Sequence, residues 1–155
     1  MLLLATGAAV AAKPATDWVE GPQRPSLNGE SGKTWFSPEF GKKSGAFDAM
    51  YDSMQDDRDK VEGDFTTARF RYTYDTPIGE AGSKLNPRHD ESITDVLLDC
   101  DRHFSGTSSI RYLLDGAEVG RQDSADSEIL MTQMTADAGT TIGDLCDFAR
   151  KRGAK

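Results

Sequence analysis

The chain has 155 residues and carries a net charge of −8 at pH 7, with a pI near 4.7. This length suits one domain with a hydrophobic core. Because only 37% of the residues are hydrophobic, we expect a small core whose stability a covalent cross-link would increase. Because an acidic chain repels polyanions, we expect no nucleic-acid partner, and an anionic membrane surface is disfavoured on the same grounds.

The first residues are typical of a secretory signal. Residues 1–12 read MLLLATGAAVAA, an uncharged apolar run that ends in small residues and stops at Lys13. About twelve apolar residues are too few to cross a bilayer, which takes about 20, and the small residues satisfy the rule for signal cleavage. We therefore predict a signal peptide over 1–12 and a single domain over 13–155. The usual basic residues before the apolar run are missing, so the signal peptide is either truncated or atypical. The alternative is a frayed apolar tail or a buried first helix.

The next apolar stretches are short and extended, over residues 18–19 and 34–36. Four apolar residues then fall at i, i+3, i+4 and i+7: Phe47, Met50, Tyr51 and Met54. Because this spacing is that of one helix face, we predict an inserted helix over Phe47–Met54 that ends before Gly63 and packs on the core.

The second half of the chain alternates apolar and polar residues, as half-buried strands do. Residues 65–74 read FTTARFRYTY, in which Phe70 and Tyr72 alternate with Arg69 and Arg71. Further strands are predicted over 93–100, 108–114 and 117–122. The last two are joined at Asp115-Gly116, a strong hairpin turn because both residues accept positive φ.

A helix is predicted over residues 141–150, with Thr141 and Asp144 as a capping box and one apolar face. The order of elements lacks the strand–helix alternation of a parallel sheet. We therefore predict an α+β fold in which an antiparallel β-sheet carries this C-terminal helix on one face, with the inserted helix in addition.

The two cysteines, Cys100 and Cys146, admit competing interpretations: buried or redox-active thiols in a reducing compartment, or a disulfide in an exported protein. The signal segment favours export and therefore a disulfide, which would tie the C-terminal helix to the end of a strand. We expect the protein in the periplasm or at the cell surface, with no transmembrane segment. No cysteine follows the apolar run, so we expect no lipid anchor.

No catalytic constellation stands out, and we expect neither an enzyme nor a cofactor. A metal site at Cys100, Asp101 and His103 lacks the paired spacing of thiolate sites. A Cys–His nucleophile pair would need His89 or His103, which lie in polar stretches and are more simply surface histidines. The acidic run over residues 56–64 departs from the calcium-loop pattern and is interpreted as a solvated helix end.

Five short stretches carry a family likeness that is firm over about residues 92–149 and looser before them: Trp18-Val19, Leu98-Asp99-Cys100, Ile110-Arg111-Tyr112, Gly116 to Val119 and Thr141 to Cys146. In these stretches the chain resembles the surface-adhesin protein E family of small exported Gram-negative proteins. The resemblance implies an antiparallel sheet with a C-terminal helix tied to it by the disulfide, and adhesion to host matrix proteins. The inserted helix and the missing lipid-anchor cysteine depart from the family pattern.

Two functions compete. The first is an exported binding protein, adhesin-like, with extracellular-matrix or other protein partners. The second is a periplasmic small-ligand-binding or inhibitor domain that uses a sheet face and the helix over Phe47–Met54 as a pocket. The sequence assigns no ligand-binding residues to either.

Overall fold

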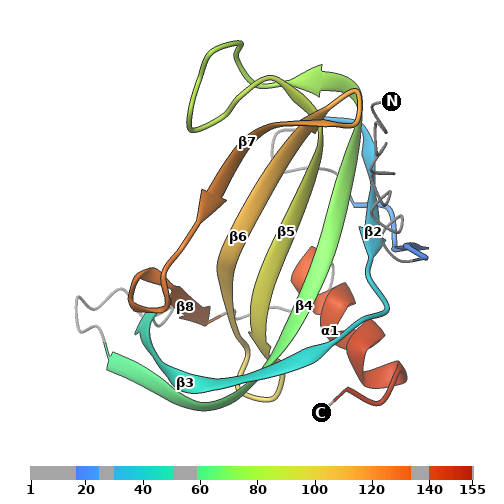
Figure 1. Ribbon diagram of the computed structural model, residues 1–155. Helices are drawn as coiled ribbons and strands as arrows, with labels where there is room; N and C mark the ends of the chain where they lie inside the picture. Colours follow the sequence, from blue (N-terminus) through green and yellow to red (C-terminus); the bar gives the residue numbers. More distant parts are fainter. Residues whose placement is uncertain (1–16, 25–29, 51–58, 134–139, 155) are drawn as a thin grey trace, which may run out of the picture.

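Residues 17–24, 30–50, 59–133 and 140–154 are described by the computed structural model, in which an eight-stranded, largely antiparallel sheet carries one α-helix (Figure 1). The predicted signal segment lies outside the described residues. The elements are β1 (Val19–Glu20), β2 (Gly32–Phe36), β3 (Gly41–Met50), β4 (Asp59–Ile78), β5 (His89–Asp99), β6 (Phe104–Leu114), β7 (Ala117–Asp123), the 3₁₀ turn η1 (Asp126–Glu128), β8 (Leu130–Gln133) and α1 (Thr141–Lys151).

The long strand β4 is the centre of the sheet. It contains the predicted strand over 65–74, where β-branched and aromatic residues favour extended backbone. One edge of β4 pairs first with β3 and then with β2, and β5 runs along the other edge. The hairpin at Asp115-Gly116 is also confirmed, because both residues have positive φ, at 51° and 81°.

The strand pairings close on themselves at one end of the molecule. β4 pairs with β3, β3 with β8 in parallel, β8 with β6, β6 with β5, and β5 returns to β4. Figure 1 shows β3 curving around this lower end. Apolar side chains that are at most 4% exposed fill the closed ring: Phe47, Ala49, Val61, Phe65, Leu97, Phe104, Ile129 and Met131.

The predicted inserted helix is wrong over residues 47–50, which belong to β3; residues 51–54 lie outside the described part of the chain. Phe47 and Ala49 are buried, whereas Met50 is 47% exposed. Burial along this segment therefore alternates with a period of two residues, as in a strand. The segment is extended because β3 pairs with β4 on one edge and with β8 on the other. The acidic residues Asp59, Glu62 and Asp64 accordingly lie on β4 and are exposed, rather than at a helix end.

The helix α1 covers the sheet face that points away from the ring. Its Leu145 and Cys146 are buried against Phe36, Val96 and Leu98, with Phe148 at the margin. Because alternate residues of a strand point to opposite faces, β5 supplies Leu97 to the ring and its two neighbours to α1. Within the described residues, no helix has the length and apolar character needed to cross a membrane.

The helix begins one residue earlier than the capping prediction requires. The hydroxyl of Thr140, rather than that of Thr141, accepts a hydrogen bond from the Gly143 amide at 3.0 Å. Asp144 is engaged elsewhere, because its two carboxylate oxygens accept 2.8 Å hydrogen bonds from the guanidinium of Arg24. This bidentate pair joins α1 to the segment before β2.

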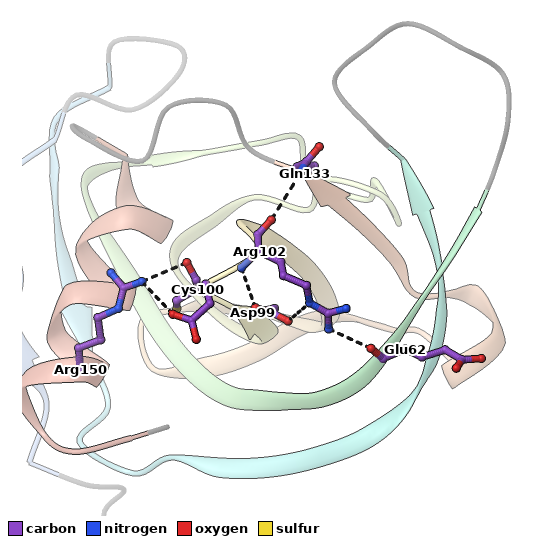
Figure 2. Close-up of polar contacts among 7 residues, drawn as sticks. Glu62, Asp99, Cys100, Arg102, Gln133 and Arg150 are labelled. Carbon is purple, nitrogen blue, oxygen red and sulfur yellow. Dashed lines mark hydrogen bonds and ion pairs between the residues drawn. The ribbon is translucent and has the colours of Figure 1, made fainter.

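The predicted disulfide between Cys100 and Cys146 is present, with the Cα atoms 5.8 Å apart. It joins the turn after β5 to α1, and polar contacts hold the turn on both sides (Figure 2). Arg150 of α1 donates to the Cys100 carbonyl at 3.0 Å. Arg102 bonds the Asp99 carboxylate at 2.5 Å and the Glu62 carbonyl of β4 at 2.9 Å. The turn is thus tied to both the helix and the sheet.

Replacement of Cys146 by Ser should lower the free energy of unfolding by about 4 kcal/mol, because the bond closes a loop with a sequence separation of 46. Chemical denaturation of the wild-type and variant proteins measures the difference. Cys100→Ser is the matched control and should cost the same, with little further loss in the double variant. Equal stability of the oxidised and reduced wild-type protein would contradict the assignment.

Candidate functional site

Outside the closed ring, the sheet has one face that packs against α1 and an opposite face that does not. Beyond the ring, β4 continues along β2 and β5, and the side chains that share a face with the buried Phe65 are now Arg69 and Arg71. We call this surface of β2, β4, β5, β6 and β7, opposite α1, the open face. In Figure 1 the helix lies behind these strands and the open face looks out of the page.

Two tryptophans and an arginine form a stack on the open face. The guanidinium carbon of Arg71 lies 5.7 Å from the ring centroid of Trp18 and 5.5 Å from that of Trp35. Trp35 also donates from its indole nitrogen to the Thr73 hydroxyl at 3.1 Å, which fixes the ring. All three stacked residues are half-buried, and a cation–π contact at such sites contributes roughly 0.5–1 kcal/mol. The stack is a rigid aromatic and cationic surface that water can still reach.

A charged network lies beside this stack. Arg69 holds both carboxylate oxygens of Asp95, at 2.5 and 3.1 Å, and Ser109 donates to the same carboxylate at 2.9 Å. Burial opposes ionisation of Asp95, but the bonds from Arg69 and Ser109 and the nearby Arg111 charge outweigh it and hold its pKa below the ordinary value. Asp95 is therefore ionised at neutral pH, and the network positions Arg69 rigidly.

Several surface hollows lie on the described part of the chain. Five of them hold about 290 to 660 Å³ and open to solvent. One of about 410 Å³ lies where the open face meets the ring, lined in part by Phe40, Lys43, Arg69 and Asp95. The ring itself is filled by its apolar core, and residues 47–50 form no helical pocket wall. The arrangement favours contact across a surface.

The prediction that both histidines are at the surface is wrong for His89. This side chain is 2% exposed, and its Nδ1 lies 2.6 Å from the Pro87 carbonyl oxygen. It is packed between Tyr74 and Tyr112, with ring centroids 5.4 and 4.7 Å away, and burial raises the pKa of both tyrosines. Apolar aromatic faces thus replace the water expected from the polar local sequence. His103 is exposed, in the turn after β5.

The disulfide decides between the interpretations of the cysteines. Both sulfurs are joined to each other, so neither is available as a thiolate nucleophile or as a metal ligand. Asp101, the proposed neighbour in a metal site, instead lies 3.6 Å from Arg150. Across the described ranges, no group of three His, Cys, Asp or Glu side chains gathers closely enough to hold a metal ion.

No family model matches this chain, and neither the curated proteins nor the solved structures include a significant match. The case for a function therefore depends on the geometry of the chain itself.

The residues of the open face were not predicted as a site. The alternation over 65–74 did indicate that Arg69 and Arg71 share a polar face. Their partners Trp35 and Asp95 lie on other strands, and only the register Trp35–Arg71 and Arg69–Asp95 brings them together. Sequence spacing carries no signal for such a register.

Replacement of Asp95 by Asn should lower stability at pH 7, and the loss should shrink as the pH falls. The folded-state pKa of Asp95 is depressed, so its stabilising contribution is present above the unfolded-state pKa of about 3.9 and is lost as the pH falls through the folded-state value. Urea denaturation of both proteins between pH 7 and pH 3 measures this.

The exposed Asp123, paired with Arg121 at 2.9 Å, supplies the control. The Asp123→Asn variant should show a smaller difference from wild type at every pH. A stability loss in Asp95→Asn that stays constant from pH 7 to pH 3 would contradict the role assigned to the Asp95 carboxylate.

Proposed function

We propose that this protein is an exported binding module that engages protein partners, adhesin-like in the manner of the surface-adhesin protein E family, through the open face. The observation that carries the proposal is the stack of Trp18, Arg71 and Trp35 on this face. Trp and Arg are among the residue types that concentrate binding energy in protein interfaces, particularly where neighbouring contacts exclude water.

Compartment and construction support this proposal. A disulfide that ties the last helix to the sheet suits an oxidising compartment, such as the periplasm or the cell surface. The apolar segment over residues 1–12 provides the route of export. A domain pinned in this way presents a preorganised surface, which lowers the ordering cost of binding.

A binding module of this kind suits a protein partner better than a small ligand. Small-molecule sites are concave and bury most of the ligand, whereas the open face is the side of a sheet with half-exposed side chains. The closed ring, which is the natural place for a small ligand in such a fold, holds Phe47, Phe65 and Phe104 instead. Host extracellular-matrix proteins are the partners that the family resemblance suggests.

Laminin and vitronectin, immobilised on a sensor surface, test the proposal directly. The full-length protein should bind at least one of them saturably at about 150 mM salt, where the Debye length is only about 8 Å and weak non-specific attraction is screened. Binding that disappears at this ionic strength would contradict a specific adhesin-like role.

Replacement of Trp35 by Ala should weaken the same binding by about 30-fold, which corresponds to the loss of about 2 kcal/mol expected of a residue at an interface centre. Trp35→Phe keeps an aromatic ring and should retain most of the affinity. Leu85→Ala, at a site that is 79% exposed in the loop between β4 and β5, is the control and should bind as wild type does. Equal affinities for all three variants, each folded by circular dichroism, would exclude the open face as the binding surface.

A further inference from the structure

A line of five side chains, three of them arginines, crosses the open face from strand to strand. Trp35 on β2 pairs with Arg71 on β4, Arg71 pairs with Ile93 on β5, Ile93 with Arg111 on β6, and Arg111 with Arg121 on β7. Because each pair stands side by side in adjacent strands, the residues form one row perpendicular to the strands. We call these five residues the arginine row.

Acidic residues line both sides of this row. On one side the next level of the same face contains Glu91, paired through Leu113 with Glu118. On the other side it contains Asp95, paired through Ser109 with Asp123. Residues two apart on a strand are separated by about 7 Å, so the carboxylates lie close to the row on either side, in levels that also contain Lys33 and Arg69. We call the four carboxylates of Glu91, Glu118, Asp95 and Asp123 the acidic borders.

Of the three arginines in the row, the outer two form ion pairs within the described residues, but the middle one does not. Arg71 lies 3.4 Å from the Glu91 carboxylate, and Arg121 lies 2.9 Å from that of Asp123. Arg111 is half-buried, and within the described residues it forms no hydrogen bond or ion pair; its charge acts on Asp95 only at a distance. Its guanidinium donors are therefore available to a partner.

The position of Arg111 also has an energetic cost. Arg111 and Arg121 are directly opposite each other in the β6–β7 ladder, and like charges in such a pair are destabilising. A carboxylate placed between the two guanidinium groups would offset this repulsion and accept hydrogen bonds from both. Within the described residues, Arg111 thus meets repulsion from Arg121 and attraction from Asp95, and neither interaction occupies its hydrogen-bond donors.

We propose that the arginine row is the docking strip for an acidic segment of a partner protein, which crosses the strands and places carboxylates on Arg111 and its cationic neighbours. The inference deepens the proposed function, on which it rests, by stating the chemistry of the partner and the line along which it lies. Trp35 closes one end of the strip, where it offers an aromatic surface to the same segment.

The acidic borders select the kind of anion. A dense polyanion, such as a sulfated glycan, would bring charge against Glu91 and Asp95 as well as against the row. A protein segment carries separate carboxylates and can keep them on the row. The acidic borders then penalise any shift of the segment along the strands, which fixes its register.

Fluorescence anisotropy of a labelled 12-residue peptide of alternating Glu and Thr tests this inference. The full-length protein should bind it saturably at about 150 mM salt, and at least tenfold more tightly than the matched Gln–Thr peptide. Heparin of similar length should bind no more tightly than the Gln–Thr peptide. Equal binding of the Glu and Gln peptides, or tighter binding of heparin, would overturn the inference.

Arg111→Thr is the decisive variant, because Thr suits a strand and removes the like-charge pair. It should weaken binding of the Glu–Thr peptide at least tenfold while its melting temperature stays equal or rises, a combination that a purely structural role would not give. Arg88→Thr, which removes an exposed arginine outside the row, should leave the affinity unchanged. Unchanged affinity in Arg111→Thr, or equal loss in both variants, would overturn the inference.

The two proposals fail separately. If laminin or vitronectin binds but Arg111→Thr binds it as tightly as wild type, the docking strip is wrong and the adhesin-like role stands. If neither matrix protein binds but the Glu–Thr peptide binds through Arg111, the choice of matrix partners is wrong and the docking strip stands.

Discussion

The structure depends on one strand, β4, that joins two parts of the same sheet in succession. β4 is 20 residues long, and the partner on one of its edges changes from β3 to β2 while β5 continues along the other. Its first half closes the ring and its second half spreads into the open face. Because side chains alternate along an uninterrupted strand, the face that buries Phe65 inside the ring is the face that presents Arg69 and Arg71 outside it. The apolar core and the candidate binding surface are thus parts of one register.

The opposite face of the sheet is covered by the helix α1. α1 packs on Val96 and Leu98, and the disulfide holds the helix to the end of β5. With the ring filled and this face covered, the charged and aromatic open face is what the described sheet leaves available to a partner. The proposal of a protein-binding module follows from that division, since the same rigidity that stabilises a thin core also holds Trp35 and Arg71 in place.

The sequence predicted local features well and contacts between strands poorly. Three local predictions are confirmed: the strand over residues 65–74, the turn at Asp115-Gly116 and the disulfide between Cys100 and Cys146. The first two depend on the local residues alone, and two cysteines allow only one intramolecular disulfide. The helix predicted at Phe47 is wrong in the described part, because the same apolar residues also fit a strand and β4 with β8 decided the outcome. His89 was misjudged because its polar neighbours in sequence are not its neighbours in space. The arginine row lay beyond prediction for the same reason: it exists only through the register of five strands.

That register is the central claim, and nuclear Overhauser effects between backbone protons of neighbouring strands test it most directly. The account predicts cross-strand contacts that link Arg71 with Ile93, Ile93 with Arg111, and Arg111 with Arg121 in sequence across the sheet. Contacts shifted by one residue, such as Arg71 opposite Thr94, would turn alternate side chains to the other face and contradict both the open face and the docking strip.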